Sequence, residues 1–310
     1  MEMRRVGRSG LQVSRLGLGT MTWGRDTDAD EAAGQLEAFV AAGGTLIDTA
    51  NVYGDGDAES IIGTLVPDVI PRSAVTLATT TVGAGSGRGG LLGALDESIT
   101  RLGGYVDLWQ VHGWDELTPF EETCSALVAA VNTGRTRYVG VSGYSGWQLA
   151  TMAAWLRHEG ITLTSTEAEY SLVEREPEQS LIPAATAHGV GLLAWAPLGR
   201  GVLTGKYRHG TPADSRGASP HFSRYVARHR NESSSRIVEA VATAADGLGT
   251  SPLAVACAWA RDRPGVVSAI VGARDSAQLL GALAAEEITL PTEIVQALQD
   301  VSDADGPDEN

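Results

Sequence analysis

Lysine and cysteine are both scarce in this chain. Its 310 residues hold one lysine, Lys206, and two cysteines, Cys124 and Cys257. The cysteines are far apart and lie in apolar stretches with helical spacing. This excludes a disulfide-rich scaffold and indicates buried thiols in a reducing cytoplasm. Neither the cysteines nor the six histidines have the spacing of metal ligands, so we predict no metal site.

Long apolar runs and a surplus of positive charge are also missing. No stretch is long enough to span a membrane, and the first residues contain no apolar signal core. The net charge is -15, and such a surface repels nucleic acid and anionic membranes. We therefore expect a cytoplasmic protein that binds a small-molecule substrate, with no nucleic-acid or membrane partner and with a homo-oligomer left open. An anionic ligand would need a local basic pocket.

Motifs of two other enzyme classes are absent as well. The turn after the first predicted strand, Gly17-Leu-Gly-Thr, lacks the full glycine fingerprint of an open dinucleotide-binding sheet. No Gly-x-Ser-x-Gly elbow joins a strand to a helix. The nearest stretch, Gly140-Val-Ser-Gly143, lacks that spacing, which argues against a serine hydrolase.

The chain does contain an alternation of strand and helix patterns, repeated about eight times. The predicted strands are 16–19, 45–48, 74–78, 106–111, 138–141, 163–169, 190–195 and 267–271. The predicted helices include 30–42, 58–65, 91–101, 147–157, 180–188, 276–285, one beginning at 251–252, and one beginning with a capping box at Thr118-Pro-Phe-Glu121.

Parallel strands joined by helices close into a barrel at this length. We therefore predict an α/β fold, a (β/α)8 TIM barrel that forms a single domain over residues 1–310. A β-hairpin at 3–13 precedes the barrel, and a long loop, about residues 205–233, follows the seventh strand. That loop is too long for a plain connector, so we expect it to be a lid or a pocket wall.

Polar and aromatic residues follow the predicted strands. A TIM barrel places its chemistry at the carboxyl ends of its strands. The residues at those ends are Thr20, Met21 and Trp23, then Asp48 and Tyr53, Thr80, His112 and Trp114, Ser142, Gly143 and Tyr144, Glu167, Trp195, and finally Gly272 and Arg274. Each one alone is explained by loop structure or core packing. Together they predict one site, at the barrel mouth, which contains acid, phenol, imidazole and indole groups.

Several motifs resemble the aldo-keto reductase superfamily, in the same order and over essentially the whole chain. They are Gly-Thr-Met-Thr-Trp-Gly at 19–24, Leu-Ile-Asp-Thr-Ala at 46–50 with Tyr53 and Gly54, Asp-Leu-Trp-Gln-Val-His at 107–112, Val-Gly-Val-Ser at 139–142, the segment 196–207, and Val-Gly-Ala-Arg at 271–274. The resemblance implies NADP(H) bound across a barrel mouth and hydride transfer to a carbonyl.

The resemblance also implies roles for individual residues. Tyr53 would protonate the carbonyl oxygen, His112 would orient that oxygen, and Asp48 would lie behind Tyr53. The expected cofactor contacts are Thr20, Met21, Ser142, Gly143, Glu167, Trp195, Leu198, Gly201, Leu203, Gly205, Lys206, Gly272, Arg274 and Gln278. Because a guanidinium suits a 2′-phosphate, Arg274 favours NADP over NAD.

The chain departs from the family at its fourth catalytic position, where Thr80 replaces a lysine. Glu167, Gly143 and Ala282 also replace amide side chains. A cation near a tyrosine lowers its pKa by about 1–3 units. Without that cation tyrosinate is scarce, which favours reduction over oxidation. The alternative is a cofactor-binding protein that carries out no net reduction, either an NADPH-sensing subunit that has lost catalysis or a redox-neutral enzyme.

If every group is ionised, the loss of a lysine and the gain of Glu167 each make the pocket more negative by one charge. We therefore expect a cationic or amine-bearing substrate, with reduction of C=N or of an amino ketone as candidates. The predicted pocket walls are aromatic, Trp23, Tyr53, Trp114 and Trp195 with Tyr144, and they favour a bulky or cyclic molecule. An altered catalytic set points to specialised metabolism.

Overall fold

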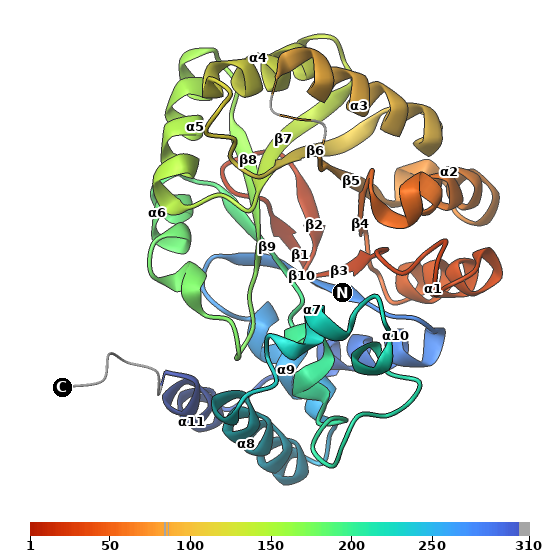
Figure 1. Ribbon diagram of the computed structural model, residues 1–310, viewed down its shortest axis with the longest axis vertical. Coiled ribbons are helices and arrows are strands. Elements are labelled where there is room, and N and C mark those ends of the chain that lie inside the picture. Colours follow the sequence, from red (N-terminus) through yellow and green to blue (C-terminus); the bar gives the residue numbers. More distant parts are fainter. Residues whose placement is uncertain (84, 86, 304–310) are drawn as a thin grey trace.

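The computed structural model describes residues 1–83, 85 and 87–303. Eight parallel strands form a closed barrel with helices around it (Figure 1). In barrel order they are β10 (Val266–Gly272), β3 (Leu16–Gly19), β4 (Leu46–Ala50), β5 (Thr76–Thr81), β6 (Val106–His112), β7 (Thr136–Ser142), β8 (Leu163–Glu169) and β9 (Gly191–Trp195). This confirms the predicted α/β architecture, a (β/α)8 TIM barrel.

The barrel strands are buried almost throughout, as expected of parallel strands with helices outside and packed side chains inside. Every residue of β4 and of β8 is buried, including the polar ones. Asp48 pairs with Gly19 and Ala78 on the neighbouring strands, and Glu167 pairs with Ser142. Polar side chains near the carboxyl ends of these strands are therefore held inside the protein rather than in water.

The helices that alternate with the strands are α1 (Ala29–Ala41), α2 (Asp57–Val69), α3 (Arg88–Leu102), α4 (Phe120–Asn132), α5 (Gly146–His158), α6 (Leu181–His188), α9 (Pro252–Arg261) and α10 (Ser276–Leu283). Side chains fix several starts: Asp28 accepts from the Glu31 amide at 2.9 Å, and Ser251 accepts from the Ala254 amide at 3.1 Å. In the described part of the chain, none of the helices is both long and apolar enough to cross a membrane.

Three helices were not predicted: α7 (Ser223–Ala227), α8 (Glu232–Leu248) and α11 (Thr292–Ser302). The segment 205–233 is therefore not one loop, because it contains α7 and the 3-10 helix η5 (Arg216–Ala218). The start of α8 is rich in serine, a residue that favours loops and helix caps. For this reason the sequence does not predict a helix there, although apolar residues recur along one face of α8.

The predicted capping box at Thr118 is wrong. Helix α4 begins at Phe120, its N-cap is Pro119, and no side chain caps it. The Thr118 hydroxyl donates instead to Asp115 Oδ2 at 2.6 Å. A local bond within the preceding loop thus replaces the bond to the helix amides.

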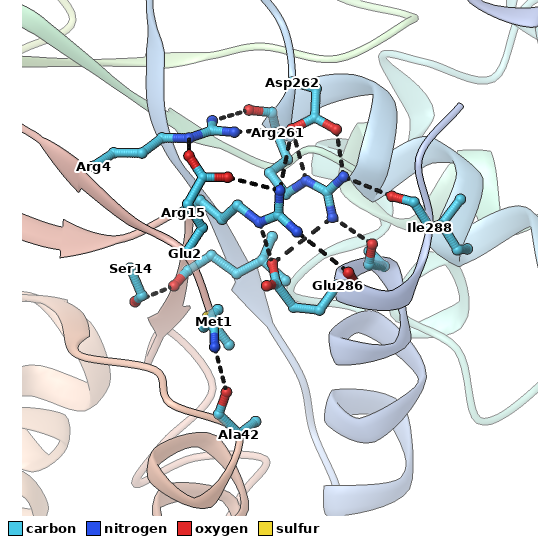
Figure 2. Close-up of polar contacts among 12 residues, drawn as sticks. Met1, Glu2, Arg4, Ser14, Arg15, Ala42, Arg261, Asp262, Glu286 and Ile288 are labelled. Atoms are coloured by element: carbon cyan, nitrogen blue, oxygen red, sulfur yellow. Dashed lines mark hydrogen bonds and ion pairs between the residues drawn. The ribbon is translucent and has the colours of Figure 1, made fainter. Parts of the chain in front are cut away.

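The hairpin of β1 (Met3–Arg5) and β2 (Gln12–Ser14) closes the amino end of the barrel. Its apolar side chains pack against residues inside the strands, including Leu46, Leu108 and Leu193. Figure 2 shows Arg4, Arg15 and the fully buried Arg261 gathered around Asp262 and Glu286 at this end. The hairpin and these ion pairs therefore cover the amino end of the barrel.

Candidate active site

A cavity of about 560 Å³ opens at the carboxyl ends of the strands. Its lining includes most of the residues predicted from the sequence: Thr20, Met21, Asp48, Tyr53, Thr80, His112, Ser142, Glu167, Trp195, Leu198, Gly201, Lys206, Gly272, Arg274 and Gln278. The fold therefore brings these strand-end residues into one site, as the sequence predicted.

Tyr53 reaches the cavity from the turn that follows β4. It begins the 3-10 helix η1 (Tyr53–Gly56), in which Gly54 and Asp55 both have positive φ angles, 58° and 55°. This tight turn carries the chain away from Asp48 and leaves the phenol in the cavity wall. Burial, with added repulsion from Asp48 and Glu167, raises the pKa of Tyr53 well above its ordinary value. The phenol is therefore a proton donor and not an anion at neutral pH.

A polar layer crosses the inside of the barrel beneath the cavity. The Thr80 hydroxyl donates to Glu167 Oε2 at 3.4 Å, and Gln110 Nε2 donates to the same oxygen at 3.3 Å. Gln110 also contacts Thr80 Oγ1 at 3.3 Å and accepts from Ser165 Oγ at 2.9 Å. Gly140 leaves room for this layer, since a Cβ atom there would lie 2.1 Å from Ser165 Oγ. Glu167 thus occupies the space beside Thr80.

Both carboxyl groups of the cavity are shifted toward their neutral forms. Burial raises the pKa of Glu167 to about 7, although hydrogen bonds from Ser142, Thr80 and Gln110 oppose the shift. Burial and the nearby Glu167 raise the pKa of Asp48 well above its ordinary value. The assumption that every group in the pocket is ionised is therefore wrong. Desolvation and mutual repulsion disfavour the doubly charged pair at neutral pH.

His112 ends β6 at the open side of the cavity. Partial desolvation lowers the pKa of its imidazole, so the ring is neutral at neutral pH and can donate one N–H. Gly143 lies behind it: its φ angle is +71°, and a Cβ atom there would be 3.4 Å from His112 Nε2. Gly143 lies outside the cavity lining, and its cofactor contact stays a prediction.

Three cations line another part of the cavity: Lys206, Arg216 and Arg274. Burial and repulsion from the two arginines lower the pKa of Lys206. Within the described chain none of the three forms an ion pair with a carboxylate. Gly201, with φ +93°, lets the backbone approach Lys206, because a Cβ atom there would lie 3.3 Å from Nζ. Asp214 acts on Lys206 and Asp26 on Arg216, but three cations outnumber these two carboxylates, so this part of the cavity is basic although the chain has a net charge of -15.

Arg216 was missed in the sequence because it lies in the irregular segment 205–233. Two contacts hold that segment to the barrel. His229 Nε2 lies 2.8 Å from Oε1 of Glu169, a residue of β8. Arg200 of the 3-10 helix η4 (Gly199–Thr204) forms a buried ion pair with Glu169, donates from Nη1 to the Tyr225 carbonyl at 2.9 Å, and lies with its guanidinium 3.9 Å from the centre of the Tyr225 ring. The segment consequently forms part of the cavity wall, through Asp214, Ser215, Arg216 and Tyr225.

Glu169, Glu174 and His229 have oxygen and nitrogen atoms within 4.8 Å of one another, the spacing of a metal site. Glu169 already accepts from Arg200, and Glu174 pairs with Arg228 at 2.8 Å. The arginines therefore satisfy both carboxylates, and the cluster joins β8 to the segment that contains Arg228 and His229.

Three predicted substrate contacts, Trp23, Trp114 and Tyr144, do not line the cavity. Trp23 is fully buried in the core, where its indole N–H donates to Gln35 Oε1 at 3.1 Å. Trp114 packs against Tyr144 and the rings of helices α4 and α5 instead.

Two predicted cofactor contacts lie outside the cavity lining as well. Leu203 is buried in the core, and Gly205, with φ +78°, ends η4. The lining that sequence reasoning missed is mostly apolar and includes Ala50, Val52, Val82, Ala196, Pro197, Leu253, Ile270, Val271 and Ala273. Of these, Ala50, Ala196, Pro197, Val271 and Ala273 lie in motifs that carried the family resemblance.

The chain matches the family model described as "Aldo/keto reductase family" over residues 15–303. It is 34% identical over 318 residues to a probable voltage-gated potassium channel subunit beta of Oryza sativa subsp. japonica, with 97% of this chain and 96% of that protein covered. It is 30% identical over 334 residues to versiconal hemiacetal acetate reductase of Aspergillus parasiticus, with 97% and 96% covered. It is 33% identical over 331 residues to L-glyceraldehyde 3-phosphate reductase of Escherichia coli strain K12, with 98% and 94% covered.

Proposed function

Since this chain belongs to the aldo/keto reductase family of oxidoreductases, we propose that it reduces a C=O or C=N group of a bulky small molecule at the expense of NADPH. One observation carries the proposal: Tyr53, Asp48 and His112 share a single cavity with three cations that form no ion pair within the described residues. The first three residues fit an acid–base site, and the cations fit a phosphorylated cofactor. Two relatives are named as reductases, which supports the reductive direction.

The donor set of the cavity fits a phosphorylated dinucleotide. Lys206, Arg216 and Arg274 would hold its phosphates, and the Arg274 guanidinium suits a 2′-phosphate, so we propose NADP(H) over NAD(H). Gln278 supports Arg274, since its Oε1 accepts from the Arg274 amide at 3.2 Å. Ser142, Glu167 and Trp195 would hold the nicotinamide, with Thr20, Met21, Leu198, Gly201 and Gly272 as further contacts. Bound NADPH would supply hydride to the substrate carbon.

The protein's own contribution is to position the substrate and to move a proton. The neutral His112 ring would donate a hydrogen bond to the substrate oxygen or nitrogen and fix its direction. The Tyr53 hydroxyl would then give that atom its proton. Because the raised pKa of Tyr53 makes tyrosinate scarce, the reverse reaction, which needs a base at this position, is disfavoured. We therefore propose a reductase that oxidises alcohols or amines poorly at neutral pH.

The walls of the cavity guide the substrate proposal. Apolar side chains, among them Val52 and Val82, with the rings of Trp195 and Tyr225, suit a bulky or cyclic molecule. A singly charged Asp48–Glu167 pair would favour a cationic group, such as an iminium ion or an amino ketone. We place such a substrate in specialised metabolism and the protein in the cytoplasm.

A spectrophotometric screen for NADPH consumption, with aldehydes, ketones and cyclic imines, tests the proposal. We expect turnover of at least one class, and a loss of about 10²- to 10⁴-fold in Tyr53→Phe with NADPH affinity unchanged. An unchanged rate in this variant would exclude Tyr53 as the proton donor.

The second candidate is a protein that binds NADPH without net reduction, and the replacement of the family lysine by Thr80 favours it. In that case the screen would show tight NADPH binding without turnover, as in a sensing subunit. Product formed without net consumption of NADPH would instead indicate a redox-neutral enzyme.

A further inference from the structure

Two buried carboxyl groups at the base of the cavity have no cationic partner. Asp48 is 4% exposed and Glu167 is 6% exposed, and both line the cavity. Within the described chain, no arginine, lysine or histidine forms an ion pair with either of them. A pair of buried carboxylates without a counter-ion is strongly unfavourable, so such groups retain protons instead.

The other charged groups around the cavity do not neutralise the pair. Arg200 is engaged by Glu169, and Lys206, Arg216 and Arg274 act on one another. His112 is neutral at the open side. The groups that act on Tyr53 are Asp48 first, then Glu167, then Tyr225. The two carboxyls and the phenol therefore form one electrostatic unit.

The hydrogen bonds of the two carboxyls differ. Glu167 accepts from Thr80 and Gln110 at 3.4 and 3.3 Å, and its partners extend to Ser142. Asp48 Oδ1, by contrast, is buried and has no partner within the described residues. Burying a charged carboxylate oxygen without a hydrogen-bond donor costs free energy, whereas burying the neutral acid costs much less. The geometry thus favours a proton on the pair, near the phenol that must be reprotonated.

We propose that Asp48 and Glu167 together store one proton at neutral pH and return it to Tyr53 after each reduction. This rests on the proposed function, because Tyr53 must first lose its proton to the substrate. The pair would then replace the lysine ammonium expected at position 80. Asp48 delivers the proton, and Glu167 is a positioning residue that sets how tightly Asp48 holds it.

The proton steps balance without any additional reagent. The Tyr53 O–H bond breaks as the substrate oxygen or nitrogen takes the proton. A carboxyl O–H bond of the pair then breaks, and the phenol O–H bond forms again. A carboxylic acid is ordinarily a much stronger acid than a phenol, whose ordinary pKa is about 10, and burial raises the pKa of Tyr53 further, so transfer from the pair to the phenolate is downhill. Water at the cavity mouth reprotonates the pair, and no electrons move in these steps.

Infrared spectroscopy of the protein without cofactor or substrate tests the stored proton directly. We expect a carbonyl stretch from protonated, buried carboxyl groups that persists above pH 6 and weakens as the pH rises through about 7, where Glu167 loses its proton. In Glu167→Gln, which keeps a similar shape, the transition near pH 7 should be lost and the remaining Asp48 band should move to lower pH. Absence of the band in the wild type, or an unchanged titration in the variant, would overturn the proposal.

The pH profile of reduction gives the second readout. In the wild type kcat/KM should fall above about pH 7, and Glu167→Gln should be at least about tenfold slower below that pH and lose this dependence. A matched control is Thr166→Val on the same strand, because the Thr166 hydroxyl is buried, has no partner within the described residues and lies outside the cavity lining. The control should keep the wild-type profile. A wild-type profile in Glu167→Gln would refute the proposal.

The two readouts separate failure of the inference from failure of the proposed function. Without turnover of any substrate, the proposed function fails, while the infrared band still decides whether the pair holds a proton. If reduction proceeds but the band is absent, the proton store is wrong and the reductase stands.

Discussion

Thr80 Oγ1 donates to Glu167 Oε2 at 3.4 Å, although their strands, β5 and β8, are separated by β6 and β7 in the barrel. The bond joins two positions at which the motif resemblance implies other residues, a lysine at position 80 and an amide at position 167. A buried carboxyl group from a strand three places further around the barrel thus lies beside the Thr80 hydroxyl. We propose that this buried acid, in place of a cation, sets the chemistry of the site.

Restoring a cation at position 80 should shift the site toward oxidation. In Thr80→Lys the ammonium would lie next to Glu167 and lower the pKa of Tyr53 by about 1–3 units. We expect the ratio of oxidation to reduction rates at pH 7 to rise about tenfold, and the tyrosinate absorbance to appear at lower pH. Thr80→Met provides a control of similar length without the charge. The explanation fails if Thr80→Met produces the same change, or if neutral aldehydes are reduced equally fast by the wild type and Thr80→Lys.

Glu167 should make the folded state less stable at alkaline pH. Its pKa is about 7 when folded and about 4.3 in an unfolded chain. Stability from the protonated carboxyl is thus fully present below pH 4 and is lost as the pH rises through about 7. Relative to Glu167→Gln, the wild type should lose about 3 kcal/mol of unfolding free energy between pH 4 and pH 8. Urea unfolding at several pH values across this range measures the free energy of unfolding of both proteins. If that free energy changes with pH equally in the two proteins, the raised pKa of Glu167 is contradicted.

Arg274 should determine the choice between NADPH and NADH. Its guanidinium lines the cavity with Lys206 and Arg216 and forms no ion pair within the described chain. Arg274→Met should weaken NADPH binding by about tenfold or more, as expected for a charge-assisted bond of about 1.5–3 kcal/mol, and should leave NADH binding almost unchanged. Fluorescence titration measures both affinities. Arg157→Met, at an exposed position on α5, serves as the control. If Arg274→Met weakens NADPH and NADH binding equally, Arg274 does not contact the 2′-phosphate.

The ion pair between Glu169 and Arg200 should hold the cavity wall in place. In Glu169→Gln the buried guanidinium loses its counter-ion, and His229 loses its partner. We expect a loss of about 3–5 kcal/mol in unfolding free energy and faster proteolysis within 205–233. The matched control is Glu239→Gln, which breaks the exposed pair with Arg208 and should cost at most about 1 kcal/mol. Similar losses in the two variants would mean that the buried pair is not the anchor.

The barrel could be predicted from the sequence because its signals are local. Each short apolar strand, such as Leu46–Ala50, is buried on both faces, and a helical stretch follows it. Residues placed directly at strand ends, such as Asp48 and His112, could be located in the same way. Helix α8 is not predicted because its serine-rich start resembles a loop, although its apolar stripe is buried where the helix packs on α9, α11 and η4.

Other parts of the site depend on tertiary contacts that a sequence does not display. Arg216 and Tyr225 reach the cavity because Arg200 and Glu169 fix an irregular segment against β8. Trp23 follows a strand, yet its ring points into the core. The ionisation of Glu167 depends on burial and on residues from three other strands, which no local pattern reveals.

The most direct test of the account follows the hydride itself. NADPH deuterated at the transferred position of its nicotinamide is incubated with the protein and with carbonyl and imine substrates, and the products are analysed by mass spectrometry. We predict a product that carries one deuterium on the former C=O or C=N carbon, at a rate that falls at least about 100-fold in Tyr53→Phe. If NADPH binds tightly but no product carries deuterium, the proposed hydride transfer to the substrate is contradicted.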